Sequence, residues 1–425
     1  MRRDGTMRRD GTMRKGEREE GYHGAGGEDG HPPPSCQLSA LELSCGFPFD
    51  GHQASPRLCG ERGAARGDDS SPRATLAAAI AASAARAPLA VAFSGGRDSS
   101  LLLAVAASVC QQLGAEPPLA VTLQFERWRQ EADERKWQEL VLEHLRLRAW
   151  RRVAVGPELD LVGPYARRHL LRDGVLFPAN AHTLAPVLEA ASGRCLLVGL
   201  GGDELLGPAQ WWHLQQLLGG RRVPEARDAL RLAAAGLPRW VRARIRRRDG
   251  ELEPLPWLRP EANRQLTRRL RVALEEPVRW GQAIRHLASR ADVALPVRSL
   301  ERLAERVGAT VAAPLLEPGF VEALARSGGA AGWRTRAEAM SALAGDLLPG
   351  KLLARRDKAR FNRVLFGAES RAFAARWRGG GVDARLVDSE ALRRAWLAPF
   401  PDFRAALLLQ AAWLHEHTQA EALAR

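Results

Sequence analysis

The chain has 425 residues, 45% of them hydrophobic and 26% charged, so it is long enough for two or three domains with a large buried core. It has no run of about 18 uncharged apolar residues and no apolar segment behind its arginine-rich start, which argues against a membrane span or a secretory signal. The net charge of +14 comes almost entirely from dispersed arginines, and the one dense cluster, Arg239–Arg248, has a single interleaved aromatic residue. We therefore expect a solvated helix face there and no nucleic-acid site.

Residues 1–75 differ from the rest of the chain. The hexapeptide Met-Arg-Arg-Asp-Gly-Thr occurs at residues 1–6 and again at 7–12, and Gly, Pro, Asp and Arg dominate up to Pro72. Because few apolar residues are available for burial, we expect a disordered tail over residues 1–75, followed by one folded domain over residues 76–425. A misplaced translation start is an alternative explanation of the repeats.

From Ala74 onward, apolar strands alternate with helical stretches. Strands are predicted at 89–93, 119–125, 150–155 and 195–199, and helices at 99–113, 129–145, 159–171 and 183–191. This order predicts an α/β fold with a doubly wound parallel sheet over about residues 86–207 and a ligand site beyond the carboxyl ends of the strands. No strand pattern recurs after Gly207, so we expect residues 208–425 to be helical.

The five cysteines (Cys36, Cys45, Cys59, Cys110 and Cys195) have no metal-binding spacing. Cys110 and Cys195 lie in apolar runs and are expected to be buried. An odd count without an export signal is typical of a reducing cytoplasm, where we expect the protein to be located.

A glycine turn joins the first strand to the first helix. It reads Ser94-Gly95-Gly96-Arg97-Asp98-Ser99-Ser100. Such a turn offers backbone N–H groups and the positive end of a helix dipole to an anion, and its glycines let the main chain approach phosphate oxygens closely. Asp98 can hold a magnesium ion. The pattern SGGxDS is the signature of the ATP pyrophosphatase loop, although an ordinary helix cap is the alternative.

The fourth strand also ends in a glycine turn with an acidic residue. Residues 198–207 read VGLGGDELLG and place Asp203 and Glu204 at the start of the next helix. Two such turns at neighbouring strand ends would bring Asp98 and Asp203 face to face across the phosphates of a nucleotide. The pair therefore predicts a shared magnesium ion that balances charge on a departing diphosphate.

With both loops the chain resembles the asparagine synthetase family in its ATP-dependent synthetase domain, where SGGxDS precedes a strand ending in G-x-G-x-D-E. Residues 314–321 (PLLEPGFV) and 348–361 (LPGKLLARRDKARF) resemble two later motifs of the family. The resemblance implies a sheet of the ATP pyrophosphatase (adenine nucleotide α-hydrolase-like) type with additional C-terminal helices, and binding of ATP and Mg²⁺.

The resemblance also assigns roles to individual residues. The diphosphate would be gripped by Ser94, Gly95, Gly96, Ser99 and Ser100, the metal by Asp98 and Asp203, and the adenosine would border the backbone around Leu123 and Gly199. Lys358 matches the family's catalytic lysine, and a mobile ammonium group there could neutralise charge at the α-phosphate. The alternatives are that Lys358 is a surface cation beside Asp357, or that Lys351 takes its role.

Two departures from the family concern the amine. Glutamine-using members begin with a cysteine after the initiator methionine, whereas residue 2 is Arg2, so we expect free ammonia, a substrate amine or ammonia from another polypeptide. Leu200 stands where relatives carry Glu or Tyr, and leucine cannot act as an acid or base. Glu204 and His182 are the candidates for that role; a structural role for Glu204 and a packing role for His182 remain open.

The expected function is an AMP-forming amide synthetase that adenylates a carboxylate and lets an amine displace AMP, as in β-lactam or lasso-peptide macrolactam formation. Its substrate would be a small molecule or peptide with a carboxylate and an amine. A separate ammonia-supplying or peptide-carrier protein is a possible partner, with Arg239–Arg248 as a place for an acidic one; no nucleic acid or membrane is expected. The alternatives are an asparagine synthase supplied with ammonia from elsewhere, a degenerate binding protein, and a tRNA-modifying enzyme.

Overall fold

The computed structural model describes residues 38–49, 71–125, 134–207, 210–218, 220, 223, 233–238, 240–242, 253–329, 332–333, 335–355 and 365–424. At its centre is a five-stranded, all-parallel sheet with strand order β3-β2-β1-β4-β5. The strands are β1 (Leu89–Ala92), β2 (Leu119–Phe125), β3 (Trp150–Val155), β4 (Cys195–Leu197) and β5 (Thr310–Ala312). The α/β fold and the parallel sheet expected from the sequence are confirmed.

The order in which the chain adds strands to the sheet reverses between β1 and β4. The chain forms β1, β2 and β3 outwards on one side and then returns to place β4 on the other side, so that Val91 pairs with both Ala120 and Leu197. In open parallel sheets a ligand binds at the carboxyl ends of the two strands between which the order reverses. The loops that follow β1 and β4 therefore flank the expected binding crevice.

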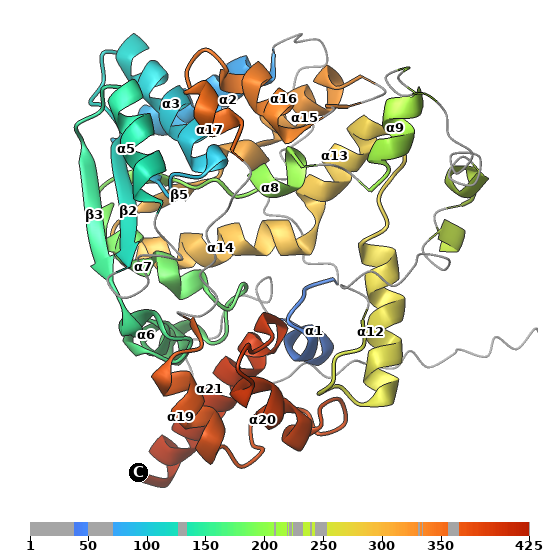
Figure 1. The fold of residues 1–425 in the computed structure, drawn as a ribbon. Coiled ribbons are helices and arrows are strands. Elements are labelled where there is room, and N and C mark those ends of the chain that lie inside the picture. The colour runs from blue at the N-terminus through green and yellow to red at the C-terminus, as the bar shows by residue number, and fades with distance from the viewer. Residues whose placement is uncertain are drawn as a thin grey trace, which may run out of the picture.

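Helices cover both faces of the sheet, which explains why β1 and β4 are almost continuously apolar and buried. Helix α3 (Arg97–Gln112) packs on β1 and is covered by α2 (Pro72–Ala84) and α16 (Arg336–Ala344), with α15 (Pro318–Ser327) packed on α2. On the other side, α7 (Ala185–Ala190) contacts β2 and β3, and α14 (Ala291–Glu305) contacts β5 and α7. In Figure 1, α2, α3, α15 and α16 lie in the upper part of the molecule, and α7 and α14 lie below them.

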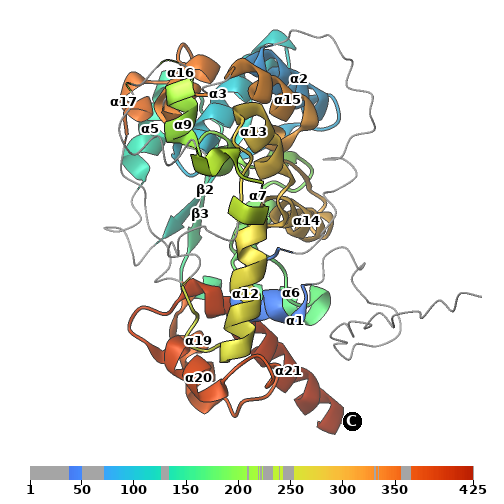
Figure 2. The same ribbon diagram turned by 90° about the vertical axis from the view of Figure 1, so that its right-hand side faces the viewer.

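A second hydrophobic core lies beyond the sheet and is built mainly from helices. Its helices are α1 (Ala40–Cys45), α6 (Pro164–Asp173), α12 (Pro260–Ala273), α19 (Ala368–Arg376), α20 (Ser389–Leu397) and α21 (Ala406–Ala424). Figure 2 shows α12 running from the height of α14 down to this helical cluster. The C-terminal helices expected from the sequence are thus present, and they form a separate core.

The remaining elements pack at the edges of these two cores. They are α5 (Arg135–His144), η2 (Pro157–Leu159), η3 (Ala181–Leu184), α8 (Gly202–Leu205), α9 (Trp212–Leu218), α13 (Trp280–Ser289), η5 (Pro314–Leu316), α17 (Gly350–Leu353) and η6 (Phe403–Ala405). The helix expected from residue 159 begins only at Pro164, because Gly163 provides an extended N-cap and proline favours the first helical position. Among the described residues, no helix has both the length and the apolarity needed to span a bilayer.

Two expectations about the domain boundaries are wrong. Residues 38–49 are not a disordered tail: Ser39 and Glu42 form a capping box at the start of α1, and Leu41 and Cys45 are buried in the helical core. The folded region that follows begins at Pro72, the first residue of α2, and not at residue 76. The other residues of the predicted tail, 1–37 and 50–70, lie outside the described part.

The expectation that no strand follows Gly207 is also wrong. Strand β5 pairs with β4, with Val311 opposite Leu196, and it extends the sheet beyond the predicted limit of residue 207. A strand of three residues is too short to show an alternating pattern in the sequence. Its place in the sheet follows from pairing with β4, a long-range contact that local sequence does not encode.

Candidate functional site

The loop after β1 is held in its shape by glycine and by α5. Gly95 has a φ of +83°, and a Cβ at this position would lie 2.9 Å from Cγ of Gln138. The side chain of Gln138 donates a hydrogen bond from Nε2 to the carbonyl of Ser94 at 3.1 Å. A residue larger than glycine would therefore move the loop away from α5.

The serines of this loop organise the start of α3. The Ser94 amide donates to Oγ of Ser99 at 3.2 Å, the two hydroxyls lie 3.1 Å apart, and the Gly96 amide donates to Oγ of Ser94 at 3.2 Å. Gly96 is the N-cap of α3, and none of the described side chains caps this helix. Ser100 is fully buried, and its Oγ has no hydrogen-bond partner among the described residues. An uncapped N-terminus of a 16-residue helix is a favourable place for an anion such as phosphate.

The loop after β4 packs directly against the first loop. A Cβ at Gly199 would lie 3.2 Å from Cβ of Asp98, and a Cβ at Gly202 would lie 2.6 Å from its Oδ1. Gly201 has a φ of +87° and lies against Leu316. The glycines of the second loop are therefore needed to let the carboxylate of Asp98 reach the end of β4.

Arg336, the first residue of α16, joins the two loops. Its Nη2 donates to both carboxylate oxygens of Asp98, with a distance of 2.5 Å to Oδ1, and its Nη1 forms an ion pair with Asp203. The side chains of Arg336 and Asp98 are 17% and 18% exposed, whereas Asp203 is 47% exposed. The two aspartates that were expected to face each other thus contact the same guanidinium group.

The charges around this triad shift the pKa values of both nearby arginines. Burial favours loss of the proton from Arg336, but Asp98 and Asp203 outweigh it and raise the pKa of this guanidinium. Arg97 has a lowered pKa, mainly because of burial and then because of repulsion by Arg336. Both pKa shifts show that two guanidinium groups and two carboxylates lie close together at these loops.

The two aspartates have the chemistry needed to hold Mg²⁺. Their carboxylates converge on one cationic group, so their oxygens lie within reach of a single cation. Magnesium in nucleotide sites is usually held by one or two carboxylates together with phosphate oxygens. Among the described residues, no group of three or more His, Cys, Asp and Glu side chains could hold a metal.

A second arginine contacts the first loop at the carbonyl of Gly95. Arg355 forms an ion pair with Glu134, lies over the ring of Trp137 with 4.9 Å to its centroid, and places Nη1 3.5 Å from the carbonyl of Gly95. Both charged side chains of this pair are less than a tenth exposed. Arg355 belongs to residues 348–361, the last of the motifs identified in the sequence. This motif therefore contacts the glycine loop after β1.

The expected catalytic lysine lies outside the described residues. Lys358 falls in the stretch 356–364, which the structure does not describe. Lys351, its alternative, is exposed on α17, four residues before Arg355.

Glu204 lies on α8 beside Asp203, at the second loop. Its pKa is raised by partial removal from water and by the negative charges of Asp203, Asp292 and Asp98. Leu200 is half-buried and packs against the sheet core, so its side chain has an apolar environment. Of the two candidate bases, Glu204 is therefore the one that the fold places at the loops.

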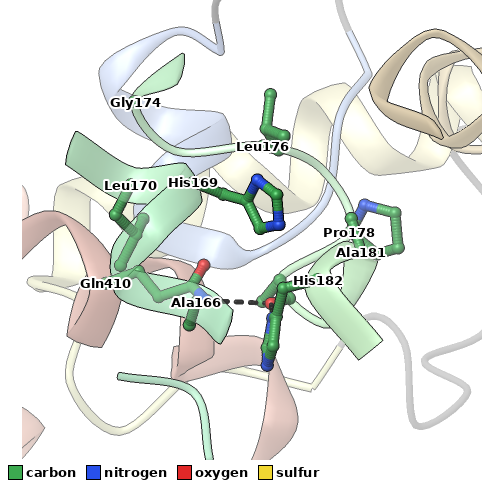
Figure 3. Close-up of a pocket in the computed structure, with 10 residues that line it drawn as sticks. Ala166, His169, Leu170, Gly174, Leu176, Pro178, Ala181, His182 and Gln410 are labelled. Atoms are coloured by element: carbon green, nitrogen blue, oxygen red, sulfur yellow. Dashed lines mark hydrogen bonds between the residues drawn. The ribbon is translucent and has the colours of Figure 1, made fainter. Parts of the chain in front are cut away.

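His182 lies in a different environment, shown in Figure 3. It is 4% exposed, and its ring nitrogens lie 3.2 Å from the carbonyl of Ala179 and 3.0 Å from that of Leu159. Burial lowers its pKa. His182 lines a small pocket with His169 and Gln410, between α6, η3 and α21. These contacts favour the packing role that the sequence left open for this histidine.

Sequence reasoning missed the residues that hold the loops in place. Arg336 lies in no motif, and in a chain this rich in arginine nothing distinguishes it. Gln138 and Glu134 begin the helix after β2, and only the fold brings them to the first loop. Arg355 could have been found, because it lies within the segment that also contains Lys358. Leu123 is half-buried on β2 opposite Val153, and its contact with adenosine stays a prediction.

Comparison with known proteins agrees with this geometry. The family model described as asparagine synthase matches residues 72–422, which include both loops, Arg336 and the segment with Lys358. No curated protein matches the chain.

Proposed function

Because the chain belongs to the asparagine synthase family of ATP-dependent ligases, we propose that it is an AMP-forming amide-bond synthetase. The observation that carries this proposal is the convergence of Asp98 and Asp203 on one cationic position beside the uncapped N-terminus of α3. Such a position suits the diphosphate part of ATP and leaves the α-phosphate as the point of attack.

In the proposed first step, a carboxylate oxygen of the substrate attacks the α-phosphate, and the bond between the α-phosphorus and the bridging oxygen breaks. The amides at the start of α3 and the hydroxyls of Ser94 and Ser99 would bind the departing diphosphate. Mg²⁺ held by Asp98 and Asp203 would neutralise part of its charge. The first step thus yields an acyl-adenylate and pyrophosphate.

In the second step, an amine nitrogen attacks the carbonyl carbon of the acyl-adenylate, and the carbon–oxygen bond to AMP breaks. We assign Lys358 the role of stabilising the anionic centre at the AMP phosphate. The amine must lose a proton, and Glu204 is the stronger candidate acceptor: it lies at the loops, and its raised pKa favours proton uptake. His182, enclosed in the packed environment described above, is the weaker candidate.

The residue at position 200, near which the attacking amine would bind, is our guide to the substrate class. Leu200 places an apolar side chain where an acid or a phenol would help asparagine formation from free ammonia, so we propose a larger substrate, such as a specialised metabolite or a peptide that is closed into a lactam. A protein that supplies ammonia or carries the peptide is a proposed partner. Asparagine formation with ammonia from another source is the alternative.

Product analysis tests this proposal. The protein is incubated with Mg-ATP and a panel of carboxylates and amines, including aspartate with ammonium and peptides with an N-terminal amine and an acidic side chain. The expected products are AMP, pyrophosphate and an amide in equal amounts. Release of ADP and phosphate would contradict the proposal, and a protein that turns over aspartate and ammonium alone would establish the alternative.

A further inference from the structure

We propose that Arg336 is a placeholder for the metal: its guanidinium occupies the position between Asp98 and Asp203 when no nucleotide is bound, and Mg²⁺ displaces it when Mg-ATP arrives. This inference rests on the proposed function, because it takes the two aspartates as the metal ligands. It adds a residue of α16 that controls when the metal site becomes available.

The contacts of Arg336 support a competition for the same oxygens. Its Nη2 reaches both carboxylate oxygens of Asp98, and its Nη1 reaches Oδ1 of Asp203. A metal ion that binds both carboxylates requires oxygens that these contacts use. Since Mg²⁺ demands near-ideal octahedral geometry, it cannot share the position with a planar guanidinium held at hydrogen-bond distance.

Electrostatics explain why a cation is needed there in the absence of nucleotide. Asp98 is largely buried, and the second loop holds Asp203 close by because Gly199 and Gly202 pack against Asp98. Two carboxylates in such a site repel each other unless a cation lies between them. Arg336 supplies positive charge between the two carboxylates, which a metal ion would supply once Arg336 has moved away.

Arg336 can leave the position without unfolding its helix. It is the first residue of α16, and the cap of that helix is made by Thr335, whose Oγ1 accepts from the amide of Glu338 at 3.1 Å. The Nε of Arg336 is buried and has no hydrogen-bond partner among the described residues. A rotation of the side chain towards a phosphate oxygen of the nucleotide would satisfy this donor.

Metal binding to the nucleotide-free protein tests the inference, with Mn²⁺ as the probe and electron paramagnetic resonance to count the free ion. Arg336→Gln should bind one Mn²⁺ about tenfold more tightly than the wild type, because a unit positive charge about 4 Å from the metal opposes binding by more than this even after screening. The melting temperature of this variant should fall without metal and recover when Mn²⁺ is added.

Matched variants separate the placeholder from a general charge effect. Arg168→Gln removes the same charge from an exposed ion pair with Glu189 and leaves the two aspartates paired, so its Mn²⁺ affinity should equal that of the wild type. Adding Asp98→Asn and Asp203→Asn to Arg336→Gln should abolish the gain. Circular dichroism shows whether Arg336→Gln is folded. If it is not, Arg336→Lys is the second variant: it keeps a positive charge but lacks the planar guanidinium that contacts both aspartates, and it should give an intermediate affinity.

An unchanged or weaker Mn²⁺ affinity in folded Arg336→Gln would overturn the inference. The result is independent of turnover. If the metal affinity rises but no substrate yields pyrophosphate, the proposed function fails and the placeholder stands; if pyrophosphate is released but the affinity does not change, the placeholder fails and the proposed function stands.

Discussion

The backbone of Gly202 lies against the carboxylate of Asp98, so closely that a methyl group on Gly202 would come 2.6 Å from Oδ1 of Asp98. Asp98 follows β1 and Gly202 follows β4, so this contact joins the segments after the two strands between which the strand order reverses. It makes the position of Asp98 depend on the absence of a side chain at residue 202.

Gly202→Ala should therefore displace Asp98 and damage the candidate metal site. We expect the affinity for a Mg-ATP analogue to fall about tenfold or more, since loss of a group that positions a metal ligand typically costs about 10–100-fold in metal affinity. Isothermal titration calorimetry measures the change. Gly319→Ala is the control, because open space surrounds that glycine and its substitution should leave the affinity unchanged.

The buried ion pair between Arg355 and Glu134 should contribute strongly to stability when one partner is removed. Arg355→Ala removes the guanidinium that pairs with Glu134 in a site less than a tenth exposed, so we expect a loss of about 3 kcal/mol in the free energy of unfolding. Urea denaturation measures it. The double variant Arg355→Met with Glu134→Leu should recover most of this loss; a double variant as unstable as the sum of the two single variants would contradict the prediction.

His169 should make the fold sensitive to acid. It lies in the pocket of Figure 3, its ring nitrogens have no hydrogen-bond partner among the described residues, and burial, followed by the charges of His182 and Arg306, lowers its pKa from 6.5 to about 4. As the pH falls below 6.5 the unfolded chain binds a proton before the folded one does, so stability is lost progressively down to about pH 4. The loss amounts to roughly 3 kcal/mol.

Denaturation at a series of pH values checks this slope. His169→Leu should flatten it, because the unfolded chain then has one proton less to bind. His213→Gln, a substitution of an exposed histidine, should leave the slope as it is. An unchanged slope in His169→Leu would show that other groups cause the acid sensitivity.

Glu42 should anchor residues 38–49 to the helical core. It is 1% exposed, and its carboxylate accepts hydrogen bonds from the amide and hydroxyl of Ser39, each at 2.8 Å, and from the amide of Phe49 at 2.7 Å. Glu42→Ala should lose about 2 kcal/mol in the free energy of unfolding, since it removes a cap and the acceptor of three partly buried hydrogen bonds. Glu42→Gln keeps an acceptor oxygen and should lose less; equal stability of Glu42→Ala and the wild type would contradict this role.

The sequence was sufficient to predict those parts of the fold in which a local residue pattern also carries the chemistry. The turns after residues 92 and 197 contain the glycines and aspartates that the chemistry needs, and the alternation of strands and helices around them predicts the sheet. The capping box of Ser39 and Glu42 was also visible in the sequence, but the composition around it favoured disorder. The low-complexity context hid a short helix that is stable because it packs against Trp257, whose indole donates to the carbonyl of Ser44.

The parts that could not be predicted depend on contacts between distant segments. Strand β5 is a strand because β4 lies beside it, and Arg336 is part of the site because α16 packs on α3. More than 200 residues separate Arg336 from Asp98, and neither residue carries a local signal of the other. The group that accepts the proton of the attacking amine could not be identified for a similar reason. Leu200 cannot act as an acid or base, so that group must come from another element.

The central claim is that Asp98 and Asp203 together bind the metal of Mg-ATP. Calorimetric titration with α,β-methylene-ATP tests it without knowledge of the other substrates. We predict that the wild type binds one equivalent of this analogue only when Mg²⁺ is present, and that Asp98→Asn and Asp203→Asn each weaken the binding about tenfold or more. Binding of equal strength in the wild type and in both variants would contradict the claim.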